Sequence, residues 1–305
     1  MKVRAILNPR AGVAAQHALA AVRRGRPSWS DLEVLVTTKP GDAQALASEA
    51  ARAGVELLLS VGGDGTANEV AQGLLGSSTA LGIVPVGSGN GLARCLRIPL
   101  DPAQALAALE QGGTRSIDVG TANGRPFLNV GGVGFDAVVG ADFQAAGRSG
   151  RRRGILSYVL LSLFRIARYR AEPLRLEADG ASHDLRPFLV CLANGPQYGG
   201  GAVIAPGAKL DDGRLDIVVI ADVPRPHLLI NIPRLFSGRL DRSRLYRRLV
   251  AGSAVLTGAA PFAYHRDGEV ETPVGRLDVG LLPRSLRVRV PLPTMNDPGG
   301  PFQRE

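Results

Sequence analysis

Three glycine-rich loops in the first 90 residues have the composition of phosphate-binding segments. They read Asn8-Pro9-Arg10-Ala11-Gly12, Val61-Gly62-Gly63-Asp64-Gly65-Thr66-Ala67-Asn68-Glu69 and Pro85-Val86-Gly87-Ser88-Gly89-Asn90. Glycine lets a backbone approach phosphate oxygens closely, and Thr66 can cap a following helix whose N-terminal N–H groups attract anions. The loops therefore predict a site for the phosphates of a nucleotide.

Asp64 is a carboxylate inside the second of these loops. A carboxylate and a phosphate repel each other, so we expect Asp64 either to bind Mg²⁺, directly or through water, or to accept a proton. The loops match neither the dinucleotide fingerprint, since no G-x-G-x-x-G follows the first strand, nor the P-loop, since its lysine is missing. One such loop alone could be an ordinary strand-to-helix turn, whereas three at successive strand ends favour a shared site.

Two further acidic clusters lie in the second half of the chain. In Asp267-Gly268-Glu269 the two acids are one residue apart, so on a strand their side chains would share a face, and their repulsion could raise one pKa and produce a general base. An ordinary hairpin turn is the alternative. Asp211-Asp212-Gly213 offers a carboxylate of the kind that binds Mg²⁺, or is an Asp-Gly turn.

The elements that position the three loops alternate between strands and helices. Apolar runs predict strands at Val3–Leu7, Leu32–Val36, Leu57–Val61 and Leu81–Val84. Helical patterns lie between them, at Ala14–Arg24, Asp42–Ala53 and Ala67–Leu75. Uniformly apolar strands separated by helices predict a parallel sheet covered on both faces, with ligands at the carboxyl ends of the strands.

After about residue 122 the pattern changes to one of many strands. Strands are predicted at Phe127–Val133, Leu174–Ala178, Phe188–Leu192, Leu215–Ile220, Tyr246–Leu256 and Leu286–Val290, with a helix at Gly154–Arg170. We expect an α/β nucleotide-binding domain over 1–122, a β-rich sandwich over 123–292, and a flexible Pro/Gly-rich tail over 293–305. The domains should meet near Ser116–Asn123, with a cleft between them.

Composition excludes several classes of protein. The two cysteines have no metal-type spacing, which argues against a disulfide framework or zinc site and fits a reducing cytoplasm. No run reaches the ~18 apolar residues of a spanning helix. The net charge is +9, with 25 Lys/Arg against 17 Asp/Glu in residues 123–305. This basic half predicts an anionic partner surface, or is a solvated arginine face.

At these residues the chain resembles the diacylglycerol kinase catalytic-domain superfamily, which includes bacterial lipid kinases and sphingosine kinases. The segments that carry the resemblance span nearly the whole chain: NPRAG, VGGDGTANEV, PVGSGNGLAR, SIDVG, LNVGGVGFDA, GAKLDDGRLD and RDGE. GGDGT alone is less specific, because NAD kinases and phosphofructokinases carry similar loops.

The resemblance implies a two-domain fold with the active site and ATP in the cleft between the domains, and it implies roles for particular residues. Asn8–Gly12, Thr37, Gly63–Glu69 and Ser88 match positions that contact ATP. Asp267 and Glu269 match the motif that supplies the general base, and Asp64 is a candidate for that role in the sphingosine kinase branch. Asp212, with the backbone carbonyls of Lys209 and Arg214, matches a structural Mg²⁺ site. Asp118 and Arg94 match members of a charged network near the active site.

Two positions depart from family patterns. Gly91 stands where some bacterial relatives have an aspartate, so a second carboxylate is lost. The aspartate that reads the sphingoid amine would fall at Val138, with Asp136 nearby. An apolar slot for the acceptor is expected in the second domain, with Tyr198, Val203, Ile204 and the helix Ile155–Phe164 as candidates.

The sequence thus predicts a lipid kinase that uses ATP and Mg²⁺. The lipid acceptor is left open between diacylglycerol, a sphingoid base and related lipids. We expect peripheral contact with an anionic membrane surface in the cytoplasm, no nucleic acid partner, and leave a homodimer open. The alternatives are an NAD-kinase-like enzyme acting on a soluble metabolite and a non-catalytic nucleotide-binding regulator.

Overall fold

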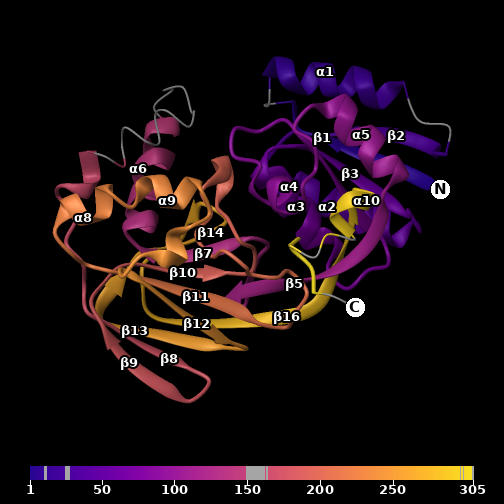
Figure 1. Cartoon of the computed structure of the whole chain (residues 1–305). Coiled ribbons are helices and arrows are strands. Elements are labelled where there is room, and N and C mark those ends of the chain that lie inside the picture. Colours follow the sequence, from indigo (N-terminus) through magenta and orange to yellow (C-terminus); the bar gives the residue numbers. More distant parts are fainter. Residues whose placement is uncertain are drawn as a thin grey trace. The chain divides into compact units, whose positions relative to one another are not determined.

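The computed structural model describes residues 1–9, 12–24, 28–148, 162, 164–295, 297 and 299–303 (Figure 1). The chain forms two compact units. Unit 1 contains Met1–Asp118, Leu210–Asp212 and the chain from Pro283 onward, and unit 2 contains Val119–Lys209 and Gly213–Leu282. The cleft expected between the two domains remains a prediction from the sequence.

Unit 1 is built on a parallel sheet. Its strands are β1 (Lys2–Leu7), β2 (Ser30–Val36), β3 (Leu57–Gly62) and β4 (Ala80–Pro85), in the order β2-β1-β3-β4. Every residue of β3 and β4 is buried, as expected for strands covered on both faces. The end of β16 (Val274–Val290) adds a fifth parallel strand through Val288 and Leu81.

The helices of unit 1 connect these strands. They are α1 (Gly12–Arg23), α2 (Asp42–Arg52), α3 (Asp64–Leu74), α4 (Gly91–Cys95), α5 (Pro102–Gln111) and α10 (Leu292–Met295). Local sequence explains where α5 begins, because Asp101 accepts a hydrogen bond from the Gln104 N–H at 2.9 Å and Pro102 occupies the first turn.

Unit 2 is a sandwich of two antiparallel sheets. One contains β8 (Leu174–Ala178), β9 (Ala181–Leu185), β13 (Ala254–Phe262) and the first part of β16. The other has the order β12-β11-β10-β7-β14-β15, formed by Tyr246–Ala251, Leu215–Ala221, Pro187–Ala193, Val130–Gly134, Tyr264–Arg266 and Glu269–Val270. Leu176, Leu192, Ile217, Leu256 and Leu277 are fully or almost fully buried in the core between them.

A second core covers the other face of the six-stranded sheet. There α6 (Phe135–Arg148), α8 (Arg225–Leu229) and α9 (Ile232–Phe236) contribute Phe135, Leu228 and Leu235. The remaining strands are β5 (Gly113–Ala122) and β6 (Arg125–Phe127), which pair with each other. Strands β5 and β16 each contribute residues to both units.

The predicted fold class, an α/β domain followed by a β-rich sandwich, is confirmed. Two strand predictions were too long: Tyr246–Leu256 is divided into β12 and β13 by a turn, and Phe127–Val133 is interrupted at Leu128 and Asn129. The helix predicted at Gly154–Arg170 lies mostly outside the described residues. Cys95 and Cys191 are free and buried.

The end of the chain, predicted as a flexible tail, contacts unit 1. Phe302 is 3% exposed, Gln303 N–H donates to Asp211 at 2.6 Å, and Arg97 pairs with Asp297. None of the helices in the described ranges combines the length and apolar content needed to span a bilayer.

Candidate active site

The predicted phosphate loops lie at one edge of the unit 1 sheet. Leu7 is in register with Val36 and Val61, and Gly62 with Pro85, so all four parallel strands end together. The first, second and third loops leave β1, β3 and β4 at this edge, and Thr37 follows β2. Arg10 and Ala11 of the first loop lie outside the described residues.

The second and third loops pack backbone against backbone. A Cβ at Gly87 would lie 2.6 Å from the Gly63 Cα, and one at Gly63 would lie 3.2 Å from the Gly87 Cα. The Val86 N–H also donates to the Gly62 carbonyl at 3.0 Å. Glycine at 63 and 87 is therefore required by this close approach.

Thr66 connects the first loop to α3, in a way that the sequence did not predict. The predicted helix cap at Thr66 is wrong: α3 begins at Asp64, its N-cap is Gly63, and no side chain caps it. Thr66 is 6% exposed within the first turn, and its hydroxyl accepts a hydrogen bond from Asn8 Nδ2 at 3.0 Å. A side chain at Gly62 would collide with Thr66.

Asp64 connects α3 to the third loop. Its Oδ1 accepts a hydrogen bond from the Gly91 N–H at 2.6 Å. Burial raises the pKa of Asp64, and the N–H groups of Gly91 and Asn90 oppose that shift. One carboxylate oxygen is thus committed to holding the start of α4.

The remaining residues of this edge are held by local contacts. Asn90 has a left-handed backbone (φ 51°) and closes its loop on Gly87 through two hydrogen bonds of 3.0 and 2.8 Å. Glu69 accepts from the Gly41 N–H at 3.0 Å, and the Thr37 N–H donates to the Leu7 carbonyl at 3.0 Å. Ser88 and Gly65 are exposed, Asn68 is 4% exposed, and Ala67 is buried.

Arg94 and Asp118, for which the resemblance implies a charged network, both make hydrogen bonds to the backbone. Arg94 Nε donates to the Gly89 carbonyl at 3.0 Å, which fixes the third loop. Asp118 is fully buried and accepts from the Arg284 N–H at 2.7 Å.

The Asp267-Gly268-Glu269 segment of unit 2 is a hairpin turn. Arg266 and Glu269 are paired, and Asp267 and Gly268 both have positive φ (46° and 84°), as two-residue hairpins require. The Asp267 carboxylate accepts from three N–H groups, those of Leu128 at 2.7 Å, Asn129 at 2.9 Å and Val130 at 3.0 Å. Glu269, in contrast, is exposed. The turn therefore separates the two acids, which do not share a strand face.

A buried polar network lies beneath this turn. His265 Nδ1 accepts from the Gly268 N–H at 3.3 Å, so its proton is assigned to Nε2, which donates to Asp136 Oδ2 at 3.1 Å. The Tyr198 hydroxyl donates to the same oxygen at 2.8 Å, and burial, followed by the charge of Asp136, raises the pKa of Tyr198. A side chain at Gly132 would overlap the Asp136 carboxylate and the His265 ring.

The predicted Mg²⁺ ligands lie in one short segment. Asp212 is half-buried and Gly213 has a positive φ of 70°, which gives a turn, while the neighbouring Asp211 accepts from the Gln303 N–H. A carboxylate of Asp212 and carbonyls of Lys209 and Arg214 are oxygen donors of the kind that Mg²⁺ prefers, so the residues fit the ion. Among the described residues there is no group of three or more His, Cys, Asp or Glu side chains that could hold a metal ion.

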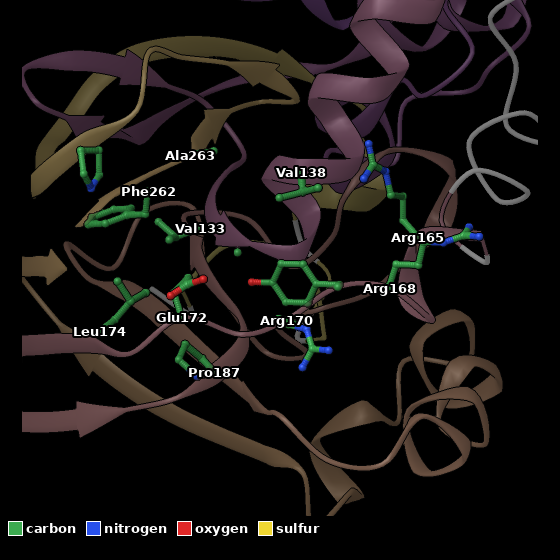
Figure 2. A pocket seen from close by; sticks show the side chains of 13 residues that line it. Val133, Val138, Arg165, Arg168, Arg170, Glu172, Leu174, Pro187, Phe262 and Ala263 are labelled. Atoms are coloured by element: carbon green, nitrogen blue, oxygen red, sulfur yellow. The ribbon is translucent and has the colours of Figure 1, made fainter. Parts of the chain in front are cut away.

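A cavity of about 320 Å³ lies in unit 2. Its apolar lining includes Val133, Val138, Leu174 and Phe262, and its charged lining comprises Arg165, Arg168, Arg170 and Glu172. Figure 2 shows Arg165 and Arg168 on one side of the view and Phe262 and Leu174 on the other. The lining of the cavity thus combines apolar and charged side chains, which suits an amphiphilic ligand.

Tyr198, Val203 and Ile204, predicted for the acceptor slot, are not among the residues that line this cavity, and most of the predicted helix 155–164 lies outside the described residues. Tyr198 belongs to the polar network, and Ile204 is 2% exposed in the core. Val138, which stands where the sphingoid-binding aspartate would fall, lines the cavity. The cavity and the Asp267 turn lie at opposite ends of the β7–β14 pair, roughly 10 Å apart at ~3.3 Å per residue.

Comparison with known proteins identifies the family. The diacylglycerol kinase catalytic domain matches residues 2–122, and the YegS C-terminal NAD kinase beta sandwich-like domain matches residues 129–290. The chain belongs to the YegS-like lipid kinase and diacylglycerol kinase family.

Individual relatives in this family match over most of the chain. A Pseudomonas aeruginosa protein named "Probable lipid kinase YegS-like" is 34% identical over 94% of this chain and 91% of its own. A Bacillus subtilis protein named "Diacylglycerol kinase" is 32% identical over 72% of this chain and 73% of its own.

Solved structures agree with the family assignment. A crystal structure from Bacillus anthracis str. Sterne, assigned as a diacylglycerol kinase, superposes with a TM-score of 0.79 at 27% identity over 95% of each chain. An NAD kinase from Archaeoglobus fulgidus in complex with ATP has a TM-score of 0.52 at 12% identity over 95% of this chain and 93% of its own, which shows a shared fold alone.

Proposed function

We propose that this chain is an ATP-dependent lipid kinase, which transfers the γ-phosphate of ATP to a lipid hydroxyl group. The observation that carries the proposal is the set of linked loops at the carboxyl edge of the unit 1 sheet, where Asn8 contacts Thr66 and Asp64 contacts Gly91. This edge is where open α/β sheets bind ligands.

The nucleotide would be bound by backbone groups of these loops. Gly63 packs closely on Gly87, so no side chain lies where the two loops meet. Helix α3 begins at the same place, with Asp64 as its first residue. Helix N-termini favour phosphate, and bound Mg²⁺ would neutralise the charge that Asp64 and the phosphates share. Asp212, with the carbonyls of Lys209 and Arg214, would hold a separate structural Mg²⁺.

Glu269 is the carboxylate best suited to accept the proton of the lipid hydroxyl. It is exposed at the end of β14–β15, whereas Asp267 already accepts three backbone hydrogen bonds and Asp64 holds the Gly91 N–H. In this proposal Asp267 orients the turn, and Glu269 acts as the general base.

The acceptor is proposed to be a lipid whose body enters the unit 2 cavity. Apolar side chains such as Val138 and Phe262 suit an acyl chain. Arg168 and Arg170 suit ester or phosphate oxygens, whereas Arg165 is paired with Asp142. We propose diacylglycerol first, because relatives from Bacillus subtilis and Mycobacterium tuberculosis are named diacylglycerol kinases, and a sphingoid or related lipid second. The basic charge of residues 123–305 supports contact with an anionic membrane.

The test is to incubate the purified protein with Mg²⁺, ATP labelled on its γ-phosphate and a total lipid extract, with NAD as a parallel acceptor. We expect a labelled lipid, identified by mass spectrometry, and at least ~10²-fold less product with Glu269→Gln, as for loss of a positioned base. Val138→Trp should raise KM for the lipid and leave KM for ATP unchanged.

The other outcomes separate the competing functions. Labelled NAD without labelled lipid would indicate a soluble metabolite kinase. Binding of ATP in a folded protein that labels no acceptor would indicate a nucleotide-binding regulator.

A further inference from the structure

An exposed apolar surface on α8 and α9 has no role in the proposed chemistry. It comprises Leu229 (39% exposed), Ile230 (75%), Ile232 (37%) and Phe236 (50%), which we call the α8–α9 patch. These four are among only ten large apolar side chains that are exposed in the described part of the chain, and they fall within eight consecutive residues. Scattered exposed apolar residues are normal, whereas a local concentration marks an interaction site.

The patch is held in its exposed position by the residues behind it. Leu228 and Leu240 are each 7% exposed in the core, and the Val203 N–H donates to the Leu235 carbonyl at 2.9 Å. The joint between the helices is fixed by Asn231, whose Nδ2 donates to the His227 carbonyl at 2.7 Å. The patch side chains therefore cannot turn inward without breaking these contacts.

The surroundings of the patch are strongly basic. Residues 225–248 contain seven arginines and one acid, Asp241. Arg225 and Arg248 pair with Asp222 and Asp216, while Arg239, Arg242 and Arg244 are exposed. Apolar side chains inside a cationic surface match a bilayer that carries anionic headgroups.

The patch is too small for a stable contact between two copies of the chain. Four partly exposed side chains fall short of the ~800 Å² per partner that a standard interface buries. Two identical arginine-rich surfaces would also repel each other. The charge therefore favours a lipid surface over a second copy.

Helix α8, which carries part of the patch, contacts the wall of the unit 2 cavity through its first residue. Arg225, the first residue of α8, donates through Nη2 to the carbonyl of Tyr169, which lines the cavity. The Arg225 guanidinium also lies 5.7 Å from the centre of the Phe188 ring, which packs on Tyr169. A membrane contact at α8 therefore fixes the position of the cavity wall.

We propose that the α8–α9 patch inserts into the interfacial region of an anionic membrane and holds the unit 2 cavity at the bilayer surface. This inference rests on the proposed lipid kinase function. Ile230 and Phe236 are the apolar anchors, and the neighbouring arginines bind lipid phosphates. Figure 1 shows α8 and α9 as two consecutive short helices in orange.

The experiment compares three proteins by sedimentation with vesicles of phosphatidylcholine, with and without phosphatidylglycerol, at low and high salt. They are the wild type, the double variant Ile230→Ser/Phe236→Ser, and the control Leu292→Ser, which removes an apolar side chain that is also 50% exposed. All three substituted side chains are exposed, so the melting temperatures should agree.

We expect salt-sensitive binding of the wild type and the control to the anionic vesicles. The double variant should bind about 30-fold more weakly, from two side chains that leave the interface. Equal binding of the double variant and the wild type would overturn the proposal. So would a wild-type dimer that the double variant converts to a monomer without any change in vesicle binding.

The failure of the proposed function would look different. Activity on short-chain lipid dispersed in detergent needs no bilayer, so the double variant should retain it. If none of the three proteins phosphorylated a lipid while vesicle binding behaved as expected, the membrane-binding proposal would be supported and the kinase proposal would be contradicted.

Discussion

The two nitrogens of His265 predict different consequences for two substitutions at the same position. Nδ1 accepts from the Gly268 N–H of the acidic turn, and Nε2 donates to the buried carboxylate of Asp136. In His265→Asn the amide oxygen can replace Nδ1, and in His265→Gln the amide nitrogen can replace Nε2. Each variant therefore keeps one contact and loses the other.

The magnitudes follow from the two environments. The Gly268 contact is 3.3 Å long and Gly268 is exposed, so its loss should cost about 1 kcal/mol, which is roughly a five-fold smaller equilibrium constant for ordering the turn. His265 and Asp136 are 3% and 8% exposed. Loss of a hydrogen bond to this buried carboxylate should cost about 1.5–3 kcal/mol of folding stability.

We therefore expect opposite results in two assays. His265→Gln should lower the melting temperature less than His265→Asn does, and should lower kcat on detergent-dispersed lipid by up to about five-fold, because Glu269 is held less well. His265→Asn should melt at a lower temperature but keep kcat within about two-fold at a temperature where it is folded. His17→Asn, an exposed position on α1, is the control. Equal effects of the two variants on kcat would refute the assignment of Nδ1 as the group that positions the turn.

Three further predictions concern unit 1 and the predicted metal site. Burial raises the pKa of Asp64, so the stability that this side chain contributes is present at low pH and is lost as pH rises through that pKa. Asp64→Asn should therefore be at least as stable as the wild type near neutral pH, and the difference between the two proteins should shrink on acidification. A constant loss of melting temperature in the variant at every pH would contradict this. Gly87→Ala should weaken ATP binding in calorimetry by about ten-fold or more, because its Cβ would displace the Gly63 backbone, whereas the control Gly275→Ala has no heavy atom within 4 Å and should bind normally. Mg²⁺ without nucleotide should raise the melting temperature of the wild type more than that of Asp212→Asn, and identical responses would remove Asp212 from the ion.

The strands and loops of unit 1 could be predicted because their signal is local. Leu57–Val61 and Leu81–Val84 are continuous apolar runs that end in glycine or proline, and the structure places β3 and β4 there. The start of α3 was placed three residues too late, because Asp64 and Gly65 were assigned to the loop on the basis of their composition.

Long-range contacts could not be predicted from spacing. The carboxylate of Asp267 meets the N–H groups of Leu128 and Asn129, more than 130 residues earlier, because those residues interrupt the predicted strand and free their backbone groups. Similarly, nothing local in the sequence indicates that Asp136 lies next to His265. Only the paired strands β7 and β14 place these residues together.

The path of the chain has a consequence for the order in which the protein is made. Unit 1 begins at the first residue, yet it takes in residues 210–212, a fifth strand at Val288 and the buried ring of Phe302. Domains made first usually fold first, while the ribosome is still adding residues. Here unit 1 cannot complete its sheet until the sandwich has been synthesised, because β4 lacks its neighbour β16 until then. A fragment that stops near residue 122 would keep all three glycine loops and still expose Leu81 at an open edge, so we expect it to aggregate where the full chain does not.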